Sequence, residues 1–329
     1  KVEQADLNMA LKGRHGEAPL PVFAAAGPGD SFDTVLEAAR VATTFMTPVI
    51  LLSDAYTANA AEPWRLPDVD AMADIAINRD IDPEGFHPFR RDQDTLARAW
   101  AVPGMPGLAH RLGGIERSAG SGHISYDPDN HQEMTDLRAA KLDRIRDFLP
   151  AAKIETGDDA GRVLVVGWGS TRGVLKSTVE ELNAEGHAVG HMHLRNLSPL
   201  PRGLEETFGL FDSIVVAELN SGQLLDELRA RFPHIPFRGL NKVTGQPFTV
   251  AEIDAAQAAL ATANLNVDRN QQLYSEGLLA RRDYEASQIT AAGYRSSLAV
   301  ARAKLNQVDI SLDRQSSQTV FAPRSGRIQ

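Results

Sequence analysis

The sequence contains no cysteine, so it can supply neither a disulfide nor thiolate ligands for zinc or an iron–sulfur cluster. It has no apolar run of about 18 residues, the length that a membrane-spanning helix needs. Residues 1–6 have no signal-peptide core. With 34 Lys and Arg against 43 Asp and Glu, the charge balance argues against a nucleic-acid partner. The 329 residues, 43% of them hydrophobic, are enough for two domains with ordinary cores.

Proline and glycine become scarce after residue 254. Only one of the 18 prolines and three of the 26 glycines lie in the last 75 residues. The charge changes too, from 25 basic and 37 acidic side chains before this point to 9 and 6 after it. The shift predicts that two unrelated kinds of structure meet near residues 250–257.

Residues 21–54 have the pattern of a βαβ unit. Two apolar runs, at 21–26 and 48–53, flank a helical pattern from Ser31, the predicted N-cap, to Thr44. The second run is continuous, as in a fully buried parallel strand. Ligands bind beyond the carboxyl ends of such strands, which points to Ser53 and Asp54. For Asp54, a turn or helix-cap role is the favoured interpretation.

Residues 62–152 are irregular and rich in proline and glycine, with one helix predicted over 130–148. A long segment of this kind is usually functional or packs against a partner. His110, His123 and His131 lie in it, but their spacings match no metal-ligand pattern, so no metal site is predicted.

A second, doubly wound α/β domain is predicted next. Strands are expected at 162–166, 187–194 and 213–218, and helices at 173–184, 205–211 and 222–232. The loop from Gly167 to Thr171 offers N–H donors at a helix N-terminus. It lacks the Lys of a P-loop and the third glycine of a dinucleotide fingerprint, so a plain strand-to-helix turn is the better interpretation.

Eight longer strings of the sequence carry a resemblance to a known protein family. They are EQADL (3–7), GRHGEAPLP (13–21), TPVILLSD (47–54), EPW (62–64), ISYDPDNH (124–131), GWGST (167–171), ELNSGQL (218–224) and KVTGQPF (242–248). In this order they resemble the alpha subunits of 2-oxoacid:ferredoxin oxidoreductases, most closely the 2-oxoglutarate type. The resemblance covers about residues 1–254. It implies an α/β fold: the C-terminal part of a pyrimidine-type thiamine diphosphate domain (1–152) and a transketolase-C-terminal-like domain (153–254).

The resemblance also implies a reaction. Enzymes of this family decarboxylate a 2-oxoacid on thiamine diphosphate, pass electrons through iron–sulfur to ferredoxin, and form an acyl-CoA. A partner beta subunit mainly supplies the sites for the diphosphate, Mg²⁺ and the [4Fe–4S] cluster, which fits a chain without cysteine. We therefore expect no cofactor or metal on this chain alone, and a cytoplasmic location.

The resemblance assigns no catalytic residue, because the family's cofactor-activating glutamate would precede residue 1; this chain alone is expected to be inactive. It does assign the tail of a substrate-facing loop, with Lys1, Glu3, Gln4 and Asp6 as candidates. The Lys1 ammonium suits contact with a substrate carboxylate. Because Lys1 is the first residue, simple exposure to solvent is the alternative interpretation. Gln4 and Asp6 suit this loop and the capping of the following helix equally well, and both interpretations stay open.

The sequence pattern of residues 255–329 predicts an antiparallel α-helical coiled-coil hairpin followed by a β segment. Leu298, Leu305 and Leu312 recur every seven residues, and residues 275–277 break the helical pattern. With the closing string TVFAPRSGRI (319–328), the order of parts resembles a membrane-fusion, or periplasmic adaptor, protein. That resemblance implies contact with an outer-membrane channel in an efflux or secretion system, which is the alternative function.

The two resemblances conflict over location. A ferredoxin-dependent enzyme works in the cytoplasm and an adaptor hairpin beyond the inner membrane, with no signal sequence to reconcile them. We therefore expect a truncated alpha subunit joined to the hairpin artificially, rather than a natural fusion.

Overall fold

The computed structural model describes residues 3–72, 74, 75, 77, 81–250, 252, 253, 272, 275 and 276. The chain forms two compact units, Lys1–Pro247 and Phe248–Gln329. Lys1 and, apart from three residues, the predicted hairpin and β segment (255–329) lie outside the described residues. The coiled coil, its likeness to an adaptor and its contact with a channel therefore stay predictions. The described residues of the first unit form two β-sheets.

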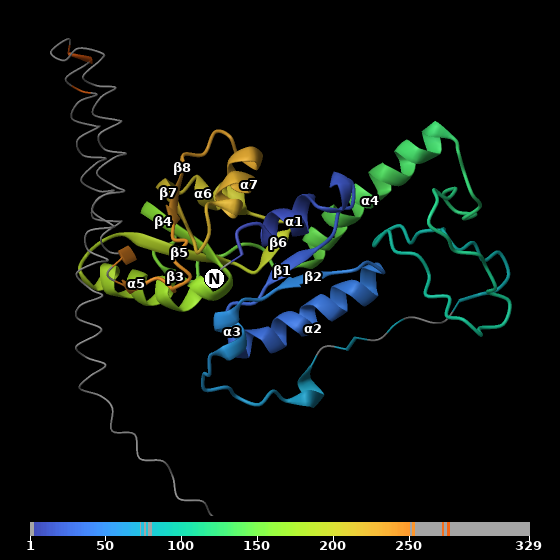
Figure 1. Ribbon diagram of the computed structural model, residues 1–329, viewed down its shortest axis with the longest axis horizontal. Coiled ribbons are helices and arrows are strands. Elements are labelled where there is room, and N and C mark those ends of the chain that lie inside the picture. Colours follow the sequence, from blue (N-terminus) through green and yellow to red (C-terminus); the bar gives the residue numbers. More distant parts are fainter. Residues whose placement is uncertain are drawn as a thin grey trace, which may run out of the picture. The chain divides into compact units, whose positions relative to one another are not determined.

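A three-stranded sheet ordered β2-β1-β6 carries the first half of this unit (Figure 1). The parallel strands β1 (Val22–Ala24) and β2 (Ile50–Leu52) are joined by α2 (Pro28–Phe45), which confirms the predicted βαβ unit. The predicted N-cap was wrong: the cap is Gly27, because proline suits the first helical turn, and the Ser31 hydroxyl donates to the Gly27 carbonyl from inside the helix. β2 is half-buried rather than fully buried, because it forms the edge of the sheet.

The segment after β2 is irregular, as predicted. It contains α3 (Ala55–Asn59), the 3₁₀ turn η2 (Val69–Ala71) and, among the described residues, three isolated β-bridges before α4 (Pro128–Phe148). Helix α4 starts two residues before the predicted position, because the Asp127 carboxylate caps it by accepting from the Asp129 N–H.

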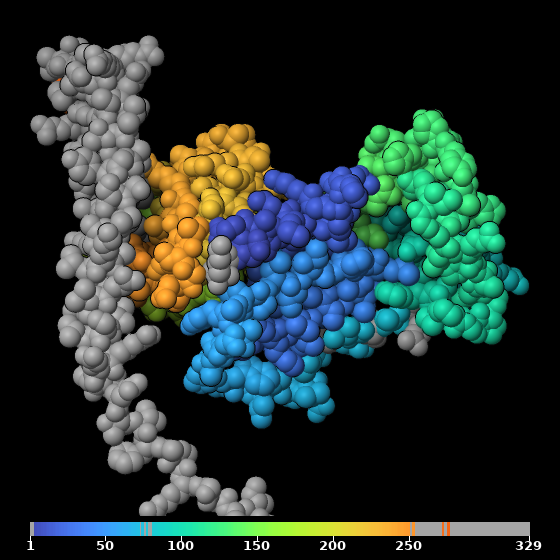
Figure 2. Space-filling model, in the orientation of Figure 1, coloured from blue at the N-terminus to red at the C-terminus, as the bar shows by residue number. Residues whose placement is uncertain are grey.

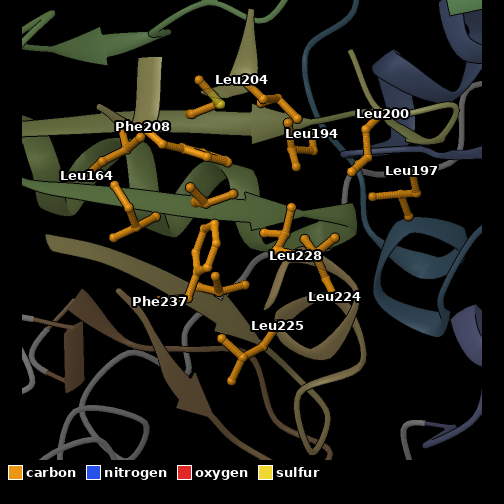
Figure 3. Packing of buried hydrophobic residues seen from close by; sticks show 14 of the residues in the cluster. Leu164, Leu194, Leu197, Leu200, Leu204, Phe208, Leu224, Leu225, Leu228 and Phe237 are labelled. Carbon is orange, nitrogen blue, oxygen red and sulfur yellow. The ribbon is translucent and has the colours of Figure 1, made fainter. Parts of the chain in front are cut away.

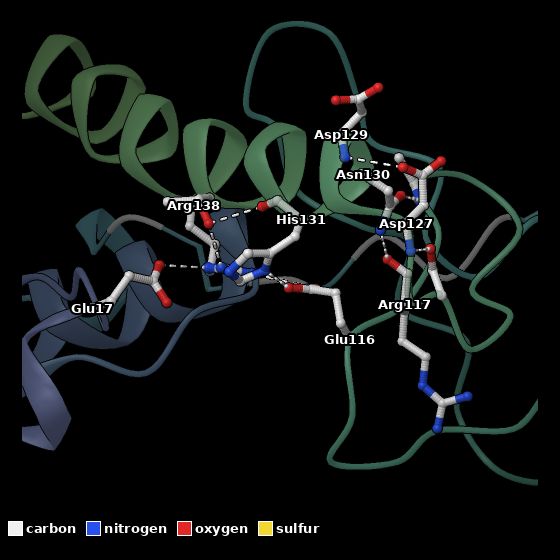
Figure 4. Close-up of polar contacts among 11 residues, drawn as sticks. Glu17, Glu116, Arg117, Asp127, Asp129, Asn130, His131 and Arg138 are labelled. Carbon is white, nitrogen blue, oxygen red and sulfur yellow. Dashed lines mark hydrogen bonds and ion pairs between the residues drawn. The ribbon is translucent and has the colours of Figure 1, made fainter.

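Helix α4 holds this irregular segment in place (Figure 4). The Asn130 amide donates to the Arg117 carbonyl at 3.0 Å and accepts from the Ala119 N–H at 2.9 Å. Further along the same helix, Arg138 lies 3.7 Å from Glu116 of this segment and also donates to Glu17, before β1, at 2.9 Å. A segment with almost no ladder of its own thus obtains backbone partners from a helix side chain.

A five-stranded sheet ordered β3-β5-β4-β7-β8 carries the second half. The strands are β3 (Thr156–Gly157), β4 (Gly161–Trp168), β5 (Val189–Leu194), β7 (Phe211–Glu218) and β8 (Phe237–Asn241). All are parallel except β3. The helices that cover it are α5 (Arg172–Ala184), α6 (Leu204–Phe208) and α7 (Gln223–Arg231).

Helices lie on both faces of this sheet, so the predicted doubly wound fold is confirmed. Helix α5 covers the face of Gly167, where an added Cβ would lie 2.3 Å from Leu175 Cδ1. The opposite face packs on α6 and α7, where the Phe208 and Phe237 rings meet edge to face at 5.2 Å (Figure 3). The helix predicted over 205–211 ends earlier than expected, at Phe208, because Phe211 already begins β7.

The two sheets are linked by a strand that passes from one to the other. β5 ends at Leu194, and after Arg195 the chain forms β6 (Asn196–Ser198), which pairs antiparallel with β1. The Ala24 N–H donates to the Arg195 carbonyl at 2.8 Å. One hydrophobic core accordingly includes residues of α1 (Asp6–Lys12), of both sheets and of α7.

The ring nitrogens of two histidines on one face of β5 are shielded from solvent. The ring centroids of His191 and His193 lie 6.2 Å apart, and no nitrogen of either ring has a hydrogen-bond partner among the described residues. Burial lowers the pKa of His191 to about 4 and that of His193 to about 3. Both rings are therefore neutral at pH 7 in the folded chain, whereas the unfolded chain binds protons below about pH 6.5.

We expect the free energy of unfolding to fall as the pH drops below about 6.5, with a slope approaching about 1.4 kcal/mol per pH unit for each histidine. Urea unfolding from pH 7.5 to 5 measures it. The double variant H191Q/H193Q should flatten this dependence, while H187Q, on the exposed turn before β5, should retain it. An unchanged slope in the double variant would refute the assignment.

Candidate functional site

The carboxyl ends of strands from both sheets meet at one small cavity of about 50 Å³, here called the strand-end cavity. Its wall consists of Asp6, Ala24, Ala25, residues 52–54, residues 168–171, Leu219 and Asn220. Ligands of parallel α/β sheets bind at this edge. Ser53 and Asp54, which were expected there from topology, both line the cavity.

Asp54 joins two elements of this wall. Its Oδ1 accepts from the Thr57 N–H at 2.8 Å and caps α3, so the predicted cap role is confirmed. Its Oδ2 accepts from the Ser170 hydroxyl, in the loop between β4 and α5. Both carboxylate oxygens therefore have partners within the protein.

The loop after β4 is the tight turn that its sequence predicts. It forms the 3₁₀ turn η3 (Gly169–Thr171), closed by the Thr171 hydroxyl donating to the Trp168 carbonyl at 2.9 Å. Gly169 has φ of 59°, and Gly167 leaves no room for a Cβ against α5. Both glycines thus serve the turn and its packing.

The candidate substrate loop binds to the start of α7. The Gln4 side-chain oxygen accepts from the Ser221 N–H at 3.0 Å and from its hydroxyl at 3.1 Å. Asp6 Oδ1 accepts from the Gln223 amide at 2.8 Å, and the same amide accepts from the Asn8 N–H. Neither Gln4 nor Asp6 is the N-cap of α1, which is Ala5.

Of the three sequence candidates that the structure describes, Glu3, Gln4 and Asp6, only Asp6 lines the strand-end cavity. Glu3 is exposed, and its carboxylate accepts from the N–H groups of Gln4 and Ala5 in a local turn. Figure 2 shows the N-terminal residues, in dark blue, beside the yellow and gold segment that contains α7. Whether this loop meets a substrate stays a prediction.

Sequence reasoning assigned no role to Glu218, although it is central to the site. This carboxylate is fully buried and accepts from Trp168 Nε1 at 2.9 Å and from the N–H groups of Leu224 and Leu225 at 2.9 and 3.0 Å. The last two donors belong to the first turn of α7, where a negative charge is favoured. Glu218 thereby fixes the position of Trp168 and of α7 together.

Asn220 completes this arrangement. Its side-chain oxygen accepts from the N–H groups of Gly222 and Gln223 at 2.7 and 3.0 Å, and its carbonyl accepts from Asn241 of β8. The available signal was the string ELNSGQL, in which Glu218 ends the buried strand β7 and three more polar side chains follow it. The side chains of Glu218, Ser221 and Gln223 contact elements distant in sequence.

The described residues contain no group of three or more His, Asp or Glu side chains that would hold a metal ion. In the same part of the chain, no helix is long and apolar enough to span a membrane. The acidic groups at the strand-end cavity, Asp6 and Asp54, are bound to Gln223 and Ser170. The geometry suits positioning of neighbouring segments rather than proton transfer.

Comparison with known proteins identifies two family models in succession. Residues 1–126 match the thiamine diphosphate-binding domain of pyruvate flavodoxin/ferredoxin oxidoreductase, and residues 161–253 match core domain II of pyruvate:ferredoxin oxidoreductase. The homologues are thus subunits of an enzyme family, and the resemblance expected for the first 254 residues is confirmed over these two ranges.

Curated relatives are subunits of the same kind of enzyme. The 2-oxoglutarate oxidoreductase subunit KorA of Mycobacterium tuberculosis is 43% identical over 274 residues, covering 83% of this chain and 42% of that protein. The alignment covers more residues than the 254 that precede the change in composition. The similarity to this subunit therefore continues past that change. The alpha subunit of 2-oxoacid:ferredoxin oxidoreductase 1 of Aeropyrum pernix is 32% identical over 227 residues, covering 66% of this chain and 34% of that protein.

A solved structure agrees with these relatives. The 2-oxoglutarate:ferredoxin oxidoreductase from Magnetococcus marinus, with 2-oxoglutarate, coenzyme A and succinyl-CoA bound, is 28% identical with a TM-score of 0.69. The match covers 76% of this chain and 44% of that one. The chain therefore spans less than half the length of these relatives.

We expect Glu218→Gln to destabilise the folded chain by about 2 kcal/mol, because the new amide turns one acceptor into a donor facing buried N–H groups. Urea unfolding followed by tryptophan fluorescence measures this and reports on Trp168. Glu206→Gln, an exposed change of the same chemistry on α6, should lie within about 0.5 kcal/mol of the parent. Equal stabilities of the two variants would show that the Glu218 network contributes little.

Proposed function

We infer that this chain, whose residues 1–126 and 161–253 match the pyruvate flavodoxin/ferredoxin oxidoreductase family, is part of the alpha subunit of a 2-oxoglutarate:ferredoxin oxidoreductase. The observation that carries the proposal is the agreement between the sequence relative and the structural relative, both named for 2-oxoglutarate. The strand-end cavity, with the loop of residues 3–6 bound beside it, supports a place near the substrate.

The whole enzyme would oxidatively decarboxylate 2-oxoglutarate, transfer the acyl group to coenzyme A, and pass electrons to ferredoxin. Thiamine diphosphate would supply the carbanion chemistry. The strand-end cavity does not fit that cofactor: ligand pockets of this kind measure roughly 300–1,000 Å³, and this cavity measures about 50 Å³. This supports sites for thiamine diphosphate, Mg²⁺ and a [4Fe–4S] cluster mainly on a beta subunit, and an inactive chain when alone.

The proposed role of this chain is to position the substrate loop. Asp6 and Asp54 accept from the neutral groups of Gln223 and Ser170, which orient these carboxylates but supply no cation for a dicarboxylate substrate. We assign Gln4 and Asp6 to holding the loop on α7. Lys1 is left as the cation suited to a substrate carboxylate. A cytoplasmic location and contacts with ferredoxin and the beta subunit follow from the same proposal.

A chimera tests this proposal. Residues 1–253 replace the part of the Mycobacterium tuberculosis subunit that aligns with them, and the chimera is then assembled with that subunit's own partner. We expect coenzyme A-dependent reduction of ferredoxin by 2-oxoglutarate, with kcat/KM higher than for pyruvate. A chimera that assembles with its partner but prefers pyruvate, or oxidises no 2-oxoacid, would overturn the proposal.

The positioning role has its own variant. In the chimera, Gln223→Leu removes the donor to Asp6 and the acceptor of the Asn8 N–H. We expect KM for 2-oxoglutarate to rise about tenfold with a smaller change in kcat, because the loop loses its fixed geometry. Gln132→Leu, at an exposed position of α4, is the matched control and should leave kcat and KM unchanged.

A further inference from the structure

Two arginines face each other in the irregular segment. Arg91 and Arg98 are directly opposite in an isolated antiparallel β-bridge. Opposed residues of this kind have Cβ atoms about 5 Å apart, and like charges there are destabilising. Arg91 Nη1 donates to the Leu96 carbonyl at 3.0 Å, and the Arg98 guanidinium lies 4.6 Å from the centroid of the Phe89 ring. The pair is thus held in place despite its repulsion.

A third cation lies near this pair. Lys141 of α4 donates to the Phe45 carbonyl at 2.9 Å. Burial, and then the charges of Arg91 and Arg98, lower its pKa to about 8. Burial also lowers the pKa of Arg98 and, together with the charges of Arg98 and Arg138, that of Arg91. No carboxylate of the described residues raises any of these three pKa values.

Within the described part of the chain, none of the three cations forms an ion pair, and Arg91 Nε is buried without a partner. Nearby carboxylates are used in local turns. Asp92 accepts from the Thr95 N–H at 2.7 Å, and Asp82 accepts from the Glu84 N–H at 2.9 Å. The positive charge is therefore left without a counter-ion among these residues.

The arginines open onto a cavity that shares no residue with the strand-end cavity. Its volume is about 800 Å³, and its wall includes Arg90, Arg91, Arg98, Phe86 and Trp100, as well as Asp82, Glu84, Asp92 and Asp94. Trp100 is fixed by donating to the Thr43 carbonyl at 2.8 Å. The space is sufficient for a small organic ligand.

We propose that Arg91 and Arg98, with the ammonium of Lys141 nearby, bind a phosphate or diphosphate group in this cavity. The two guanidinium groups on the wall favour this class, because neither has an ion-pair partner among the described residues. Guanidinium groups match the oxygens of phosphate in a bidentate geometry. Free diphosphate and the charged end of a nucleotide share this chemistry, and aromatic walls such as Phe86 and Trp100 suit a base.

Calorimetric titration of the chain with pyrophosphate and with ADP tests the proposal, with sodium acetate at equal ionic strength as the reference. We expect binding of pyrophosphate and none of acetate. Tighter binding of ADP would identify a nucleotide, and equal binding a free diphosphate. Arg98→Gln should weaken binding at least tenfold, whereas Arg65→Gln, an exposed change in the same segment, should not. No binding of either phosphate compound would overturn the proposal.

Stability and amine reactivity give independent readouts. Without phosphate at low salt, Arg98→Gln should unfold at a higher temperature than the parent, because a repulsion is removed, and pyrophosphate should stabilise only the parent. Acylation of Lys141 at pH 8 should slow when pyrophosphate is bound, because the bound anion raises the pKa of the amine. If pyrophosphate stabilised parent and variant equally, its effect would be general screening of charge, and the proposed site would be refuted.

Discussion

The arrangement of the first unit depends on the passage of the chain through Arg195, from β5 of one sheet into β6 of the other. The backbone of Arg195 accepts from Ala24, and its guanidinium binds Asp30 and lies 3.6 Å from Glu37 on α2. Burial alone would raise the pKa of Asp30, but the Ala26 N–H and the Arg195 charge together hold it below its usual value. For Glu37, burial outweighs the same arginine and raises the pKa. The junction is therefore an ion pair to Asp30 with Glu37 at its side.

Because of this junction, the carboxyl ends of β1 and β2 meet those of β4 and β7. Glu218 then orders that edge from within. A buried carboxylate is stable only when donors replace its water, and Trp168 and the first turn of α7 provide them. Once α7 is fixed, Ser221 and Gln223 can hold Gln4 and Asp6. The N-terminal loop thus depends on a charge that lies far away in sequence.

Sequence reasoning succeeded where the pattern is local. β4 and β7 are continuous apolar runs between turns, and α4 and α5 follow helical spacing, so they could be predicted. β8 could not, because Arg238 and Gly239 interrupt its apolar pattern, and β6 is only three residues long. The bond from Gln4 to Ser221 joins residues 217 apart and has no local signature. Asp54 was predictable as a cap, since that role needs only the next three residues, but its bond to Ser170 was not.

Two polar clusters of this unit, around Glu218 and around Arg91 and Arg98, differ in how completely their charges are matched. Both oxygens of Glu218 have donors, and such a satisfied network rigidifies a fold. The pair of Arg91 and Arg98 is the reverse: two like charges are held opposite each other, one with a buried unpartnered nitrogen, in a segment stabilised mainly by α4. A buried donor without a hydrogen-bond partner costs about 1–3 kcal/mol of stability. Neutral residues at these positions would avoid that cost. A bound anion would convert the same geometry from a penalty into a stabilising contact, which is why the unmatched cluster, rather than the matched one, points to a ligand.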